Sequence, residues 1–294
     1  MRSPTTILSR SHPRGPISLM KLWWLLFCFV LTAGSQALFG QSSGSNPIAR
    51  FHTDLGDIDV VLLQDVAPNT VANFLRYVNR GAYDNSFIHR SVPSFIVQGG
   101  GYTYLNGQPT SIPQDPPVVN EFHVSNKRGT LAMAKLAGNP NSATNQWFFN
   151  ESNSNAANLD TQNGGFTVFG RMINSSGLAA MDTIAAVPIF NVGAPFDQLP
   201  LQNYAGGTIV DANLVHVIWI KVVPQILALT HPAANTVHLQ GRGVASSTYQ
   251  LQTSVAPTAT TFTTLVTVTA DSTGNISYDD TSAGTKKFYR LAIP

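Results

Sequence analysis

The chain has 294 residues and a formal net charge of +2, enough for one domain of ordinary size and a smaller module. Four of the 17 basic residues, but none of the 15 acidic ones, lie before residue 22, which leaves 13 basic and 15 acidic residues in the rest. A slightly acidic protein lacks the basic surface that nucleic-acid binding requires. The one cysteine, Cys28, lies near the start, so the rest of the chain excludes disulfides, thiol catalysis and cysteine-bound metals.

The first 37 residues have the features of a secretory signal peptide. Lys21 precedes an apolar run at 22–31, which is too short to cross a bilayer comfortably as a helix. Ser35-Gln36-Ala37 fits a small-x-small cleavage site. We expect residues 1–37 to be removed, no stable membrane insertion afterwards, and a periplasmic or extracellular protein. An uncleaved membrane anchor is the alternative. Residues 38–46 are expected to form a flexible lead-in.

Short strands and two helices are expected from residue 47 onward. Residues 49–53 and 57–62 flank a turn and predict a β-hairpin. Pro68 opens a helix whose apolar residues recur at helical spacing, and Gly81 ends it.

The chain between 101 and 119 is rich in Pro, Gly, Gln and Thr, which predicts a long surface loop. A second helix is expected over 178–186. Further strands are expected at 129–134, 146–149, 166–169 and 210–223, the last one bounded by Pro224.

The composition changes after Pro224. Residues 224–230 are expected to be a linker, and 231–294 are rich in Thr and Ser with alternating apolar positions. This pattern predicts a small β-sandwich-like module near the lower size limit of independent stability. In 47–223, many short strands with two helices suggest a closed β-barrel capped by helices.

The run from Phe87 to Gly100 combines an apolar wall with polar donors. Phe87, Phe95 and Val97 can line one side, while Arg90 and Gln98 offer hydrogen bonds beside it, as a small-ligand pocket requires. The segment resembles the signature of cyclophilin-type peptidyl-prolyl isomerases. Further blocks that match the family follow in the family's order at 129–135, 142–150, 159–160 and 165–171. Several ordered blocks are a stronger signal than one short motif.

The resemblance covers residues 47–223 and implies a mainly β fold. Its architecture would be a closed eight-stranded antiparallel β-barrel with two capping helices. The implied function is the acceleration of X–Pro isomerisation in exported proteins, which assists their folding. The implied partners are proline-containing polypeptides and not nucleic acid, with no cofactor, no metal and a monomeric state.

Rotation about an X–Pro bond has a barrier of about 18–20 kcal/mol because the amide is conjugated. A catalyst therefore needs a dry slot for the proline ring and a donor aimed at the proline nitrogen, which becomes more basic in the twisted state. By resemblance, Arg90 is this donor and Gln98 orients it, so these two residues are the catalytic candidates. The resemblance assigns substrate binding to His89 at the edge, Phe95, Met133, Ala134, Lys135, Gln146, Phe148, Leu159 and Phe166.

Asn158 departs from the family pattern, in which Trp or Phe is common at this position. The change is expected to weaken binding of the cyclic-peptide inhibitor cyclosporin more than isomerisation. Two other functions stay open at this point. The domain could be a non-catalytic binder of proline-containing segments, or the protein could be a surface adhesin that acts through residues 231–294.

Overall fold

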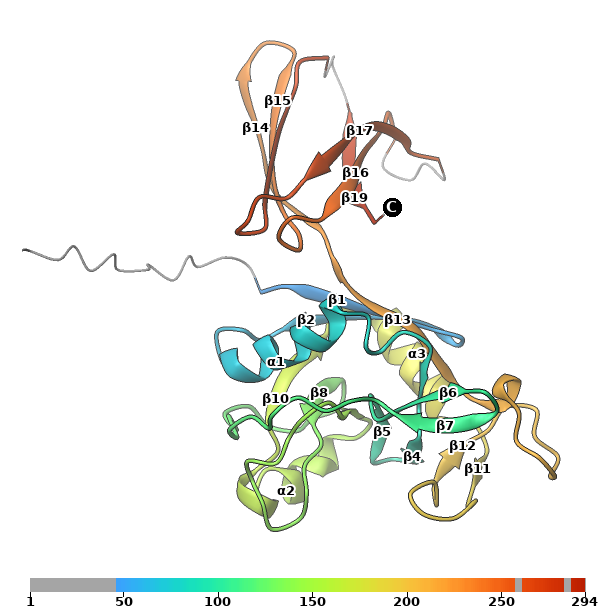
Figure 1. The fold of residues 1–294 in the computed structure, drawn as a ribbon. Coiled ribbons are helices and arrows are strands. Elements are labelled where there is room, and N and C mark those ends of the chain that lie inside the picture. The colour runs from blue at the N-terminus through green and yellow to red at the C-terminus, as the bar shows by residue number, and fades with distance from the viewer. Residues whose placement is uncertain (1–45, 257–260, 283–286, 294) are drawn as a thin grey trace, which may run out of the picture. The chain divides into compact units, whose positions relative to one another are not determined.

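The computed structural model describes residues 46–256, 261–282 and 287–293 (Figure 1). The expected signal peptide and nearly all of the expected lead-in lie outside these residues. Among the described residues, none of the helices has both the length and the apolar character needed to cross a membrane.

The fold is mainly β, with a curled antiparallel sheet and a few helices (Figure 1). The sheet has 11 strands in the order β4-β5-β9-β8-β10-β2-β1-β13-β3-β6-β7. Strands β4 and β7 are the two edges of this order. Closure into the expected eight-stranded barrel stays a prediction. The strands are β1 (Ile48–Thr53), β2 (Gly56–Leu62), β3 (Ser86–Phe87), β4 (Arg90–Val92), β5 (Ile96–Gly99), β6 (Tyr102–Leu105), β7 (Gln108–Ser111), β8 (Thr130–Met133), β9 (Trp147–Asn150), β10 (Val168–Met172) and β13 (His216–Val223).

Helix α1 (Pro68–Asn79) begins at Pro68, as the sequence predicts. Its first N–H groups are satisfied from a distance, since the Glu121 carboxylate accepts hydrogen bonds from the N–H groups of Asn69 (3.2 Å) and Thr70 (2.8 Å). Burial alone would raise the pKa of Glu121, but these bonds outweigh it, and the pKa lies below its usual value. A carboxylate also stabilises the positive end of the helix dipole.

Helix α3 (Ser175–Ala185) begins three residues before the expected 178–186. The side chain of Asn174 accepts a hydrogen bond from the Gly177 N–H (2.8 Å) and so caps the helix. Short helical turns occupy η1 (Asn153–Asn155), α2 (Ala156–Leu159), η2 (Gln162–Gly164) and η3 (Asp211–Asn213).

The main core lies between the sheet and its two long helices. Phe51 packs edge-on against Trp147 (4.9 Å between ring centroids) and stacks on Phe74 of α1 (5.8 Å). Trp147 also explains the glycine pair of the signature. A Cβ on Gly100, whose φ is +80°, would lie 2.6 Å from Trp147 Nε1, so this position requires glycine.

Two predictions about secondary structure are wrong, one of a loop and one of a strand. Residues 102–111, within the expected surface loop, form a hairpin of β6 and β7 in which Tyr102 pairs with Ser111. Asn106 and Gly107 both have positive φ at its turn, which is the usual chemistry of a two-residue hairpin. Residues 210–215 precede the last strand of the sheet and do not extend it, since β13 begins at His216.

The residues after Pro224 form two three-stranded sheets in the orders β14-β15-β18 and β17-β16-β19. The two sheets share a core of Leu239, Tyr249, Leu251 and Ile276. Strand β14 covers most of the predicted 224–230 linker. The strands are β14 (Gln225–Ala233), β15 (Thr236–Arg242), β16 (Thr248–Ser254), β17 (Thr263–Thr269), β18 (Asn275–Asp280) and β19 (Phe288–Ala292).

Candidate active site

Strand pairing brings the main candidate residues into one row across the sheet. Arg90 on β4 pairs with Gln98 on β5, and Gln98 pairs with Phe148 on β9. Directly paired residues project to the same face of a sheet. The sheet therefore places a cation, an amide and an aromatic ring side by side, although they are far apart in the sequence.

The opposite face of the same strands belongs to the core. Val97 and Phe149 alternate with the row and lie in the main core cluster. One wall of the site is thus fixed by the residues that stabilise the fold.

Four polar side chains form a connected chain at the site. The Nε–H of Arg90 donates to Gln198 Oε1 (2.9 Å), and Nη1 donates to Gln98 Oε1 (3.4 Å). The Nε2 of Gln98 then donates to Gln146 Oε1 (2.9 Å). Burial lowers the pKa of the half-buried Arg90 below its usual value, and the nearby Asp197 opposes this effect. A guanidinium stays charged under such a shift.

An apolar pocket of about 240 Å³ lies beside the guanidinium. The rings of Phe148 and Phe166 meet edge to face at 5.8 Å, and Phe95 and Leu159 belong to the same apolar cluster. The pocket is lined by Arg90, Phe95, Ile96, Gln98, Ala134, Lys135, Phe148, Leu159, Gln162 and Phe166.

Hydrogen bonds outside the pocket hold two of its walls. The Asn155 side chain donates to the Phe95 carbonyl (2.6 Å) and so fixes the turn that carries Phe95. The Phe166 N–H donates to the Leu159 carbonyl (2.8 Å). These bonds restrain Phe95, Leu159 and Phe166 without using their side chains, which stay available to a ligand.

Lys135 bends back onto the rim of the pocket. Its Nζ donates to the carbonyls of Asn163 (2.9 Å) and Gly165 (2.5 Å) and lies 4.8 Å from the ring centroid of Phe166. Burial lowers its pKa below the usual value. The neighbouring Ala134 N–H donates to the Gln146 carbonyl (3.0 Å).

Two predicted binding residues lie behind the pocket. Met133 is buried in the main core cluster. His89 is 3% exposed, and its ring meets Tyr102 at 5.1 Å. Burial lowers the pKa of His89 to about 4; the charge of Arg90 adds to this effect, and a hydrogen bond with Gln146 opposes it. The side chain of His89 is enclosed in this structure, and its contribution at the pocket edge stays a prediction.

Three residues that contact the site were not predicted. Ile96 and Gln162 line the pocket, and Gln198 bonds Arg90 from a segment 108 residues further along the chain. Ile96 lies inside the signature and could have been inferred from strand alternation. Gln198 lies in a stretch without helical or strand periodicity, so the sequence carries no signal for its position.

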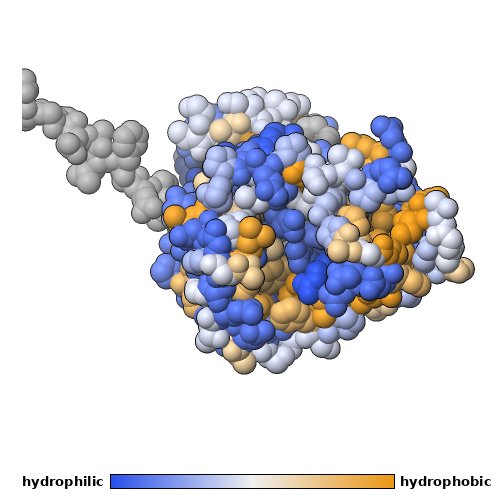
Figure 2. All heavy atoms as spheres, turned by 60° about the horizontal axis from the view of Figure 1, so that its bottom comes forward, coloured by the Kyte–Doolittle hydropathy of each residue, from blue (hydrophilic) through white to orange (hydrophobic). Residues whose placement is uncertain are grey.

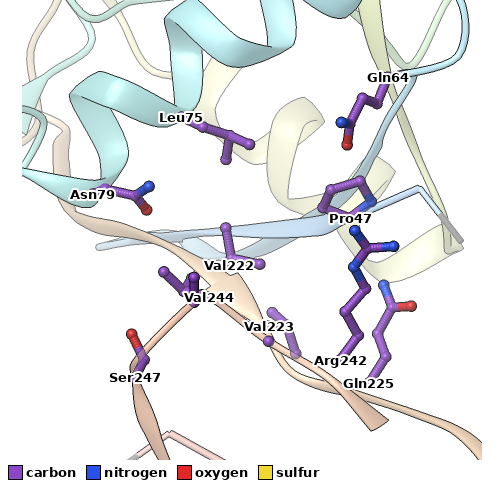
Figure 3. A pocket seen from close by; sticks show the side chains of 12 residues that line it. Pro47, Gln64, Leu75, Asn79, Val222, Val223, Gln225, Arg242, Val244 and Ser247 are labelled. Atoms are coloured by element: carbon purple, nitrogen blue, oxygen red, sulfur yellow. The ribbon is translucent and has the colours of Figure 1, made fainter. Parts of the chain in front are cut away.

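A larger cavity, of about 480 Å³, lies elsewhere. Pro47, Leu75 and Val222 meet Arg242 and Val244 around it (Figure 3). None of the predicted site residues lines this cavity, and Arg242 is the one charged side chain among its lining residues. The smaller pocket is the better candidate, because there a fixed cation faces an apolar slot.

Comparison with known proteins agrees with this geometry. A family model described as "Cyclophilin type peptidyl-prolyl cis-trans isomerase/CLD" matches residues 48–205. The chain belongs to the cyclophilin-type peptidyl-prolyl cis-trans isomerases. Its activity is accordingly the isomerisation of peptidyl-prolyl bonds.

The chain is similar to bacterial peptidyl-prolyl cis-trans isomerases. It is 37% identical to a peptidyl-prolyl cis-trans isomerase of Acinetobacter baylyi over 152 residues, which are 51% of this chain and 77% of the relative. It is also 37% identical to peptidyl-prolyl cis-trans isomerase B of Escherichia coli over 142 residues, 47% of this chain and 83% of the relative.

A crystal structure of a Cryptosporidium parvum cyclophilin, determined in the presence of the dipeptide Ala-Pro, is 22% identical with a TM-score of 0.44. It matches over 60% of this chain and 98% of that one.

Proposed function

We propose that this cyclophilin isomerises X–Pro bonds in exported polypeptides and assists their folding, with Arg90 as the catalytic donor. One observation carries the proposal: the half-buried guanidinium of Arg90 lies beside an apolar pocket of about 240 Å³ that is walled by Phe95, Phe148 and Phe166. A pyrrolidine ring is compact and apolar, and burying it in such a slot is favourable.

Isomerisation breaks no covalent bond, so the site has to stabilise a twisted amide. When the X–Pro bond is half turned, its conjugation is lost and the nitrogen lone pair can accept a hydrogen bond. An N–H of Arg90 donates to this nitrogen. The planar cis and trans amides have no such lone pair, so the bond is stronger in the transition state than in either ground state, which lowers the barrier.

The remaining polar groups hold the substrate backbone. Gln98 lies between Arg90 and Gln146 and bonds both, so its amide is fixed where the chain around the proline would pass. Ala134 and Lys135 stand on the rim, where we propose that main-chain groups bind the residue before proline. The Lys135 ammonium faces the 163–165 carbonyls, which makes it a support of this rim.

Export rests on the first 37 residues. The basic start, the apolar run at 22–31 and the small-x-small site at 35–37 support removal of a signal peptide and release as a monomer into the periplasm or medium. Expression of the full chain, followed by cell fractionation and mass spectrometry of the new N-terminus, tests this proposal. A protein retained in the cytoplasm at full length would contradict it.

The role of Arg90 is tested by Arg90→Ala and Arg90→Lys in an isomerase assay on a proline tetrapeptide. We expect kcat/KM to fall by about a hundredfold or more in Arg90→Ala, as when one donor to developing charge is removed elsewhere. The control is Arg171→Ala, since Arg171 is an exposed arginine on β10. Wild-type activity in a folded Arg90→Ala variant would refute the assignment.

A further inference from the structure

Gln198 contacts the guanidinium of Arg90 from outside the family signature. Its Oε1 accepts the Nε–H of Arg90 at 2.9 Å, and its main-chain carbonyl accepts the N–H of Ser91 at 2.9 Å. We propose that Gln198 is a positioning residue for isomerisation, which holds the guanidinium of Arg90 in the orientation that the reaction requires. This inference rests on the proposed catalytic role of Arg90.

The geometry of the guanidinium gives this bond its importance. The group is planar, and its N–H donors point in fixed directions. A bond at Nε fixes the plane of the whole group and leaves the two terminal nitrogens for other partners. Gln98 takes Nη1 at 3.4 Å, which is beyond the usual range of such bonds. Gln198 therefore provides the shorter of the two side-chain bonds that hold Arg90.

The segment that carries Gln198 is itself anchored. The next residue, Leu199, begins strand β12 (Leu199–Pro200), which pairs with β11 (Ile189–Phe190). Leu199 and Leu201 are buried with Phe87 and Leu214 in one apolar cluster. Figure 2 shows apolar side chains gathered on the side where Figure 1 draws β11 and β12. Gln198 is thus mounted on a packed element.

A second reading gives Gln198 only a structural role, in which it ties its segment to β4. The main-chain bond from Ser91 to Gln198 already makes that tie, and it does not depend on the side chain. Replacement of the side chain alone therefore separates the two readings. Gln202 offers a matched control in the same segment, because its side chain donates to the Leu214 carbonyl (3.0 Å) and bonds no active-site residue.

The experiment compares Gln198→Leu, Gln198→Asn and Gln202→Leu in the full chain, with kcat and KM measured separately on a proline tetrapeptide. We expect Gln198→Leu to lower kcat by about tenfold, the loss of one hydrogen bond to a charged group, with little change in KM. Gln198→Asn keeps the amide on a shorter stem and should lose less. Gln202→Leu should keep the wild-type kcat.

A double-mutant cycle gives a readout that a structural role would not move. If Gln198 acts through Arg90, Gln198→Leu should have no further effect on kcat once Arg90 is replaced by alanine. The NMR resonance of the Arg90 Nε–H should also shift in Gln198→Leu and in no Gln202 variant. Should Gln198→Leu fail to fold, Gln198→Met, which also lacks the amide, gives the same comparisons.

Three outcomes would overturn the proposal: a wild-type kcat in folded Gln198→Leu, an equal loss in Gln202→Leu, or an undiminished effect in the Arg90→Ala background. The proposed function fails separately, if Arg90→Ala alone keeps full activity. A loss in Arg90→Ala with none in Gln198→Leu would overturn only the positioning role.

Discussion

His89 makes the stability of this protein depend on pH in a defined window. Its ring is enclosed behind the active site, and burial lowers its pKa from 6.5 to about 4. Below pH 6.5 the unfolded chain binds a proton at this residue while the folded protein does not. Protonation therefore favours unfolding, and the stability that the neutral ring provides is present above pH 6.5 and is lost progressively down to about pH 4.

The size of the effect follows from the same two pKa values. They correspond to about 3 kcal/mol when the window is crossed completely and to about 2 kcal/mol between pH 7.5 and 5.0. This is a large part of the 5–15 kcal/mol by which domains are usually stable.

Urea unfolding at pH 7.5, 6.5, 5.5 and 5.0 measures this loss in the wild type and in His89→Gln, which cannot titrate. We expect the wild type to lose about 2 kcal/mol more than the variant over this range. Replacement of the exposed His123 by glutamine controls for the removal of a histidine as such. Parallel stability curves for wild type and His89→Gln would refute the reasoning.

Two further predictions concern packing around the site. Phe148→Leu and Phe149→Leu, on the two faces of the same strand, should each lower the free energy of unfolding by about 1 to 1.5 kcal/mol. Only Phe148→Leu should lower kcat/KM, because it removes a ring from the pocket, and equal activities in the two folded variants would contradict the assignment of faces. Gly99→Ala places a Cβ 2.7 Å from Trp147 Cη2 and should lower the free energy of unfolding by about 1–3 kcal/mol. The loss should be smaller in the Trp147→Phe background, where the ring is smaller. An equal loss in that background would show that the clash is with another residue.

The signature made much of the pocket predictable, since Arg90, Phe95 and Gln98 all line it. The expected wall of Phe87, Phe95 and Val97 was wrong for two of its three residues. Strand alternation turns Val97 to the core face, and Phe87 is buried in a different apolar cluster. Burial was harder to predict. Nothing in the chemistry of His89 or Met133 distinguishes a residue at a pocket edge from one packed behind it.

The β6–β7 hairpin was missed for a different reason. Asn106-Gly107 is a strong turn signal, but the flanking residues on β7 are all exposed and do not alternate. The composition of this segment therefore favoured a loop. The hairpin forms because β6 pairs with β3 in the large sheet. Gln198 could not be found from the sequence, because its position depends on how Leu199 and Leu201 pack.

The edge strand β7 of the large sheet bears on how this protein avoids unwanted pairing with other chains. Strand β7 has four residues, Gln-Pro-Thr-Ser, all exposed, at one end of the sheet. Short polar edge strands that contain proline are poor templates for the addition of another chain. This border of the sheet is thereby protected from main-chain pairing with other chains and from edge-to-edge aggregation.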